Sequence, residues 1–141
     1  MRIVLDTNIW ISAVISENGR MKQLIDKISR NNENVIIVSS SILDEITKTL
    51  NNNNRNRKNR KKRKIFTEEH RVRFNKLLQI ARVEFIESKQ IESLDIYISD
   101  PNDRHVIETA INGNANVIIT GDSDFEDVKT NLFKVIRPSE F

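Results

Sequence analysis

The chain has 141 residues, of which 38% are hydrophobic and 30% charged, with a net charge of +3, a composition typical of a globular protein with one core. The absence of cysteine excludes a disulfide scaffold, a zinc ribbon and a thiol nucleophile. No apolar run is long enough to cross a bilayer and Asp6 interrupts any apolar leader, so we expect one cytoplasmic domain over residues 1–141 with no membrane partner.

Apolar runs and helical repeats alternate along the first part of the chain. Residues 2–5 and 35–38 are short, continuous apolar runs, which are typical of buried strands. Apolar residues recur at helical spacing from Met21 to Ile28 and again from Ile42 to Leu50. The second repeat follows the serines at 39–41, whose hydroxyls can cap a helix. These signals predict two strands, each followed by a helix.

The segment 51–64 differs from the rest of the chain. Four asparagines precede a run, 55–64, that holds eight of the 23 basic residues and no acid. The remaining residues include 15 basic and 20 acidic side chains, a net charge of −5. An acidic body with one basic segment indicates a polyanionic partner, whereas the simpler interpretation is a solvated, mobile loop. Without an apolar residue, the segment cannot contribute to a core.

Strand and helix signals also alternate in the second half. Apolar runs at 83–86, 117–120 and 133–136 predict three more strands. A parallel sheet needs helices on both faces, so the alternation predicts an α/β fold: three layers, α/β/α, with a central parallel sheet of four to five strands. The intervening helices are expected to begin at Thr67, with Val72, Leu77 and Leu78 buried; at Asp100-Pro101, ending at Gly113; and near 124–129.

Carboxylates recur where the predicted strands end or the next helices begin. Asp6 follows the first strand, Asp122 follows the strand at 117–120, and Asp124 is two residues further on. Glu45 and Asp103 lie in the first turns of helices that start at the same edge of the sheet. Because the carboxyl ends of parallel strands meet at one edge, we expect these acids to lie together.

Carboxylates without histidine or thiol partners are the ligand set of Mg²⁺ or Mn²⁺. Such ions bind phosphate oxygens and activate water, which points to metal-dependent phosphodiester hydrolysis. Asp100 is expected to cap a helix, yet it could replace Asp103 in the site; we favour Asp103 because it continues the stripe of Val106 and Ile107. We expect His70 and His105 to be exposed or hydrogen-bonding residues outside the acidic site. We expect Trp10 and Phe125 to lie in the core or in a lid.

Four motifs in this order resemble the PIN domain family over essentially the whole chain: Leu5-Asp6-Thr7-Asn8, Ser40 to Glu45, Asp100-Pro101-Asn102-Asp103 with Glu108-Thr109-Ala110, and Thr120 to Phe125. The resemblance implies RNA cleavage with Mg²⁺ or Mn²⁺. It also implies that small members are often toxins held inactive by an antitoxin, and that many form homodimers. By position, Asp6, Glu45, Asp103 and Asp122 would be the catalytic, metal-binding acids and Asp124 a further ligand. Thr7, Asn8 and Thr120 would orient those acids or the attacking water.

The segment 51–64 departs from the family pattern. It could contact RNA phosphates through Arg55, Arg57, Lys58, Arg60, Lys61, Lys62, Arg63 and Lys64, or contact an antitoxin. A phosphatase using a phosphoenzyme is disfavoured, because Asp6-Thr7-Asn8 lacks the second acid of an Asp-x-Asp pattern. A catalytically silent RNA-binding or partner-binding module stays open as the alternative to a ribonuclease.

Overall fold

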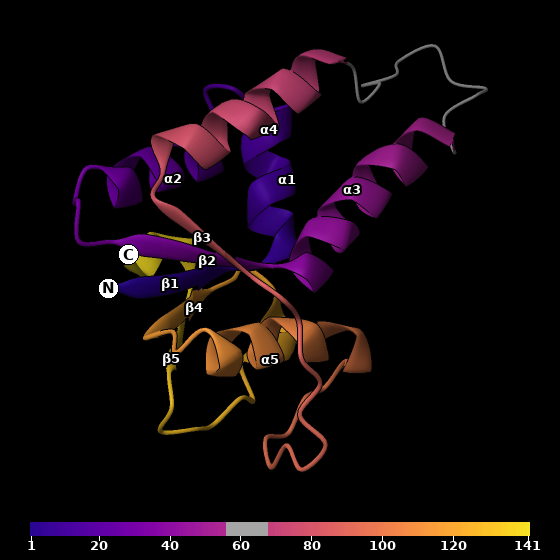
Figure 1. The fold of residues 1–141 in the computed structure, drawn as a ribbon, viewed down its shortest axis with the longest axis vertical. Helices are drawn as coiled ribbons and strands as arrows, with labels where there is room; N and C mark the ends of the chain where they lie inside the picture. The colour runs from indigo at the N-terminus through magenta and orange to yellow at the C-terminus, as the bar shows by residue number, and fades with distance from the viewer. Residues whose placement is uncertain (56–67) are drawn as a thin grey trace.

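A parallel five-stranded sheet forms the centre of the computed structural model, which describes residues 1–55 and 68–141 (Figure 1). The strand order is β3-β2-β1-β4-β5. Their bounds are β1 (Arg2–Leu5), β2 (Val35–Ser39), β3 (Val83–Ile86), β4 (Val117–Ile119) and β5 (Lys134–Ile136). β1 is central, pairing Ile3 with both Ile36 and Val117. Its apolar residues are fully buried because helices cover both faces.

The described residues form five α-helices: α1 (Thr7–Ile15), α2 (Arg20–Ser29), α3 (Ser40–Arg55), α4 (Glu68–Ile80) and α5 (Arg104–Asn112). In Figure 1, α1, α2 and α4 lie on one side of the sheet and α5 lies on the other. The predicted three-layer α/β/α architecture is therefore confirmed. Among the described residues, no helix combines the length and apolar character needed to span a membrane.

α3 begins behind the predicted serine cap and runs further than expected. The backbone N–H of Ile42 donates to the hydroxyl of Ser39 at 3.3 Å, which satisfies an orphan donor of the first turn. The helix continues to Arg55, so the first residues of the segment 51–64 are helical. Residues 56–64, with seven of the eight basic side chains of the run, lie outside the described residues.

α1 is a helix that the apolar pattern of the sequence does not predict. Its buried residues include Ile9, Trp10, Ile11 and Val14, which occupy more than half of the helix circumference. It contacts α2, α3 and α4, and the indole of Trp10 packs edge-on against the ring of Phe74, with centroids 5.9 Å apart. Only Asn8 and Ser12 are exposed along this helix, which leaves too narrow a polar face for a clear amphipathic period. Trp10 is thus a core residue.

Two local expectations are wrong. Val72 is 45% exposed, because the buried face of α4 continues through Phe74, Leu77 and Leu78, and position 72 does not fall on that helical stripe. In place of a helix at 124–129, the chain forms a single 3-10 turn, η2 (Ser123–Phe125), which buries Phe125. The predicted core position of Phe125 is confirmed.

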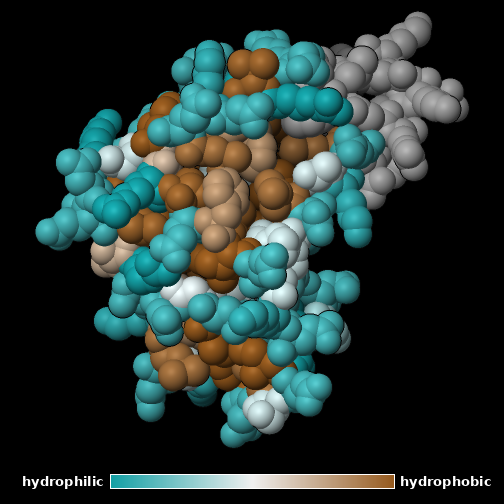
Figure 2. All heavy atoms as spheres, in the orientation of Figure 1, coloured by the Kyte–Doolittle hydropathy of each residue, from teal (hydrophilic) through white to brown (hydrophobic). Residues whose placement is uncertain are grey.

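Some apolar side chains remain exposed at the surface. Figure 2 shows hydrophobic side chains between α4 and α5, bordered by hydrophilic ones. β3 is an edge strand, and its Phe85 is 57% exposed, as is about half of Ile80 at the end of α4. Exposed apolar groups near a sheet edge are a surface on which protein partners can pack.

Candidate active site

The site lies at the carboxyl edge of the two central strands. Asp6 follows β1 directly, and its backbone N–H donates to the carbonyl oxygen of Ile119 at the end of β4, at 3.1 Å. Thr120 continues β4 and is itself held by β5, through a bond from its N–H to the carbonyl of Ile136. The register of three parallel strands therefore fixes where the side chains of Asp6 and Thr120 meet.

The hydroxyl of Thr120 connects two of the predicted acids. It donates to Oδ2 of Asp6 at 2.8 Å and accepts the backbone N–H of Asp122 at 3.0 Å. Asp122 in turn accepts the N–H of Asp124 at 2.9 Å, which forms the turn of η2. Burial raises the pKa of Asp6, and the Thr120 hydrogen bond offsets only part of that rise. Asp6 is 5% exposed, so its orientation is tightly defined.

Asp100 and Asp103 both reach this edge from the loop before α5. One carboxylate oxygen each of Asp100, Asp103 and Asp124 lies within 4.8 Å of the others. Asp100 also accepts the N–H of Asn102 at 3.0 Å and so caps η1 (Pro101–Asp103). Capping and a place in the cluster are thus compatible, and Asp100 and Asp103 both belong to the cluster.

Asp103 has the most perturbed carboxyl group of the cluster. Its pKa rises to about 6, first because of burial and then because of four neighbouring charges, those of Asp122, Asp6, Asp100 and Asp124. Its Oδ2 atom is buried and has no hydrogen-bond partner among the residues that the structure describes. A buried carboxylate oxygen without a partner is costly unless a cation or a proton satisfies it.

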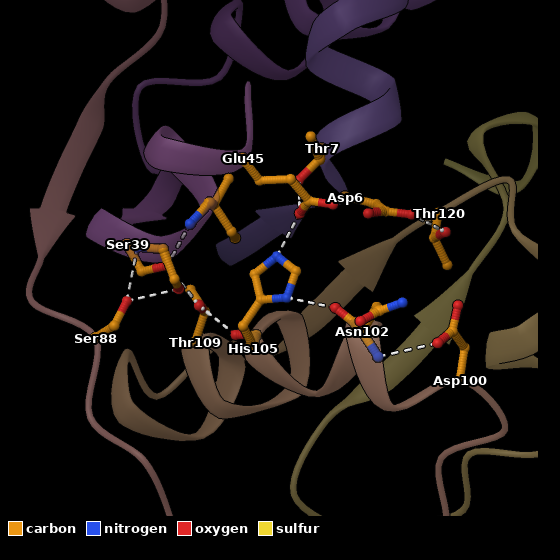
Figure 3. Close-up of polar contacts among 12 residues, drawn as sticks. Asp6, Thr7, Ser39, Glu45, Ser88, Asp100, Asn102, His105, Thr109 and Thr120 are labelled. Carbon is orange, nitrogen blue, oxygen red and sulfur yellow. Dashed lines mark hydrogen bonds and ion pairs between the residues drawn. The ribbon is translucent and has the colours of Figure 1, made fainter. Parts of the chain in front are cut away.

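Glu45 joins the site from α3 through two neighbours. Its Oε2 atom accepts the hydroxyl of Thr7 at 2.7 Å and lies 2.5 Å from Nε2 of His105 (Figure 3). The other ring nitrogen of His105 contacts the carbonyl oxygen of Asn102 at 2.7 Å. His105 hydrogen-bonds, as expected, but it also lies inside the acidic site, which the sequence reasoning did not foresee.

A signal for His105 was present in the sequence. The residue follows Asp103 by two positions, on a helix that begins at the functional edge of the sheet. The helix-start argument that predicts the positions of the acids applies equally to a histidine at the start of the same helix. Applying the helix-start rule to all polar residue types would have included His105.

The pKa values of this pair shift in opposite directions. The hydrogen bond from His105 lowers the pKa of Glu45, more strongly than burial raises it. Burial lowers the pKa of His105, but the hydrogen bond and charge of Glu45 outweigh it, so the pKa lies above its ordinary value. Both shifts favour the charged forms, as expected for an ion pair.

The remaining predicted residues are placed as follows. Thr7 holds Glu45 and Thr120 holds Asp6, while Asn8 is exposed and lines a cleft of about 430 Å³ together with Gly121 and Asp122. Arg55 is the last residue of α3. The other basic residues proposed to contact RNA lie outside the described part of the chain: Arg57, Lys58, Arg60, Lys61, Lys62, Arg63 and Lys64.

The donor set fits a hard divalent cation such as Mg²⁺ or Mn²⁺. Carboxylate oxygens are the ligands these ions prefer. The unpartnered Oδ2 of Asp103 needs a positive partner, and Asp100 and Asp124 offer oxygens close enough to share one. Asp6 and Asp122 raise the pKa of Asp103 electrostatically, so they contribute negative potential at the same place.

Fold and site together define an α/β/α protein with an acidic centre at the carboxyl edge of a parallel sheet. The sequence profile of the PIN domain matches residues 2–124, and the chain therefore belongs to the PIN domain family. PIN domains are generally nucleases that use divalent metal ions. A comparison with curated proteins found no match.

A solved structure with the same fold is the crystal structure of VapBC2 from Rickettsia felis bound to a DNA fragment from their promoter. The matching chain superposes with a TM-score of 0.63 at 19% sequence identity. The match covers 97% of this chain and 98% of that chain. At this identity the likeness establishes the fold, and the site is argued from the residues above.

Proposed function

We propose that the protein is a metal-dependent endoribonuclease that hydrolyses RNA phosphodiester bonds at its carboxylate cluster. The observation that carries this proposal is a buried oxygen of Asp103 that has no hydrogen-bond partner among the described residues and lies in an acidic cluster of a PIN domain. Four other aspartates act on Asp103: Asp6, Asp100, Asp122 and Asp124. Glu45 completes the cluster from α3. So many like charges repel both one another and an RNA phosphate unless cations lie between them.

Asp100, Asp103 and Asp124, whose carboxylate oxygens lie within 4.8 Å of one another, would hold Mg²⁺ or Mn²⁺. Asp6 and Asp122, which act electrostatically on Asp103, and Glu45, which acts on Asp6, would be further ligands. A bound ion would polarise the phosphate and stabilise the negative charge that develops during hydrolysis. The side chains around the acids keep them in position: Thr120 fixes Asp6, and Thr7 and His105 fix Glu45. Preorganisation of this kind lets a site act without rearranging its own dipoles.

We further propose that the protein acts as the toxin of a toxin–antitoxin pair in the cytoplasm. Two observations support this: the small PIN domain fold and its similarity to a chain of the VapBC2 structure. A cognate antitoxin would then be a protein partner that covers the acidic site or its surroundings. The exposed apolar side chains Ile80 and Phe85 give the molecule surface for an antitoxin or for a second copy of the chain.

The test is cleavage of an end-labelled, single-stranded RNA by the purified protein with Mg²⁺, with Mn²⁺ and with EDTA. We expect cutting with either ion and none with EDTA. Asp6→Asn should abolish cleavage and keep the fold, because it removes one charge from a repulsive cluster. The matched control is Asp95→Asn, an exposed acid on the loop before α5, which should cut at the wild-type rate.

The alternative function, a silent RNA-binding module, predicts a different pattern. Binding of the same RNA without cleavage under any ion would favour that module. Cleavage that is equal in the wild type and in Asp6→Asn would contradict the assignment of the site.

A further inference from the structure

A cavity of about 260 Å³ opens beside the acidic cluster. It lies between η2, β5 and the C-terminal residues, and Thr120 and Asp122 belong to its lining. These two residues also belong to the cluster, where Thr120 donates to Asp6. A group in the cavity would therefore lie directly beside a phosphate at the carboxylates.

The inner wall of this cavity is apolar. It is formed by Phe125, Val128, Val135 and Ile136. Phe125 is 2% exposed, so the wall is firmly backed by the core. An apolar wall beside a phosphate site suits the flat face of a nucleobase that has been turned out of a single strand.

The rim of the cavity carries charge of both signs. Glu126 and Arg137 form an ion pair there, and both side chains are more than half exposed. Glu140 accepts the backbone N–H of Arg137 at 3.0 Å, which holds the rim together. The rim holds two carboxylates and one guanidinium, so its net charge is negative, and a negative rim disfavours a phosphate as the occupant. These side chains favour a neutral group that offers N–H donors and also an acceptor.

Guanine is the base with that combination on one edge. It presents two N–H donors, at N1 and N2, next to the O6 acceptor, whereas adenine, cytosine and uracil each lack the adjacent donor pair beside an acceptor. A carboxylate can accept both N–H groups in a bidentate arrangement, and arginine is a recurrent partner of guanine O6. Glu126 and Arg137 provide both groups at one rim.

We propose, resting on the ribonuclease function above, that this cavity binds an unpaired guanine next to the scissile phosphate. Glu126 accepts hydrogen bonds from N1–H and N2–H, Arg137 donates one to O6, and the ring packs against Val128 and Val135. The cavity thereby determines where in an RNA the enzyme cuts. Glu126 and Arg137 are specificity-determining residues, separate from the acids that hold the ion.

The first test maps cleavage positions on a random-sequence, single-stranded RNA with Mn²⁺, by sequencing the new ends. We expect the wild type to prefer phosphates next to guanine by at least about tenfold, the size of discrimination that one bidentate base contact supplies. Glu126→Gln should reduce this preference to about threefold or less. Val128→Phe, which fills the cavity, should also remove it.

The matched control is Glu68→Gln, which alters an exposed ion pair with Arg71 on α4, away from the cavity. It should keep the wild-type cleavage pattern. A wild-type enzyme that cuts without base preference would overturn the proposal. So would a preference that persists in both Glu126→Gln and Val128→Phe.

A binding test separates failure of this inference from failure of the ribonuclease function. Asp6→Asn protein is titrated with fluorescent uridine hexamers that carry one central guanosine, inosine or uridine. We expect the guanosine oligomer to bind at least about fivefold more tightly than the uridine oligomer. Inosine, which lacks the N2 amino group, should fall between them, and Glu126→Gln added to Asp6→Asn should equalise all three. Equal binding from the start would overturn the base pocket, whatever the cleavage assay gives.

Discussion

The ring of His105 is held between two acceptors, Oε2 of Glu45 at 2.5 Å and the carbonyl oxygen of Asn102 at 2.7 Å. A neutral imidazole has one N–H donor, whereas a protonated imidazole has two. Two acceptor partners therefore favour the doubly protonated ring. Below its raised pKa, His105 is therefore a cation within the acidic site that offsets the charge of the acid from α3.

The first prediction concerns this pair. The pKa of His105 is raised and that of Glu45 is lowered. The ion pair therefore stabilises the fold fully between two pH limits, the pKa of glutamate and the pKa of histidine in the unfolded chain. It is lost as the pH rises through the folded pKa of His105. His105→Ala should then lower the free energy of unfolding by about 1 kcal/mol near pH 6, after allowance for solvent exposure, and by less near pH 9.

Urea unfolding at the two pH values measures this effect. Glu45→Gln should remove the same pH-dependent part of the free energy of unfolding. The double variant should remove no more of that part than either single variant, because both act on one ion pair. An equal loss at both pH values would show that His105 stabilises by packing and not by charge.

The second prediction follows from the pKa of Asp103, which is raised to about 6. A carboxyl group with a raised folded pKa contributes stability below its unfolded pKa, and that contribution is lost as the pH rises through the folded value. Ionised Asp103 therefore destabilises the metal-free protein above about pH 6. Asp103→Asn should raise the melting temperature in EDTA at about pH 7.5 by several degrees, and by little near pH 4.

Thermal melts of the wild type and Asp103→Asn across this range provide the measurement, with Asp95→Asn as an exposed control. A constant difference between wild type and Asp103→Asn at all pH values would contradict the charge explanation.

The third prediction is that divalent ions stabilise the fold through Asp100 and Asp103. An ion that binds only the folded state adds about 2.7 kcal/mol at a concentration one hundred times its dissociation constant. Mn²⁺ should therefore raise the melting temperature of the wild type. Asp100→Asn and Asp103→Asn should each reduce that increment, because their oxygens lie within 4.8 Å of each other and of Asp124. An unchanged increment in Asp100→Asn would place Asp100 outside the metal site.

Strand ends and helix starts, read together, predict which acids lie near one another at this edge of the sheet. Asp6 and Asp122 follow neighbouring parallel strands, and the register of β1 with β4 leaves their backbones little freedom. Asp100 was harder to place, because a capping aspartate and a ligand have the same sequence signature. Its Oδ1 atom caps η1, and its carboxylate still lies beside that of Asp103. The same carboxylate therefore caps the 3-10 turn and belongs to the acidic cluster.

The features that the sequence did not predict have a common physical origin. α1 packs against three helices and leaves only Asn8 and Ser12 exposed, so its sequence shows little helical period, although the resemblance placed Asp6 and Thr7 in the expected site. The cavity beside Asp122 is assembled from η2, β5 and the last residues of the chain. Its lining is brought together by tertiary packing alone, and no local spacing in the sequence indicates it.

The final prediction concerns the hydroxyl of Thr120, which donates to Asp6 and accepts from the backbone of Asp122. Thr120→Val keeps the side chain's shape but leaves the buried carboxylate of Asp6 and the partly buried N–H of Asp122 without their partner, at a cost of about 1–3 kcal/mol in stability. The pKa of Asp6, already raised by burial, should rise further without this donor. Cleavage by Thr120→Val should therefore fall at least about tenfold, and the pH at which activity appears should shift upward. Thr120→Ser restores the hydroxyl and should restore both readouts, measured as the pH–rate profile on the labelled RNA. A valine variant whose profile matches that of the serine variant would mean that the strand register alone positions Asp6.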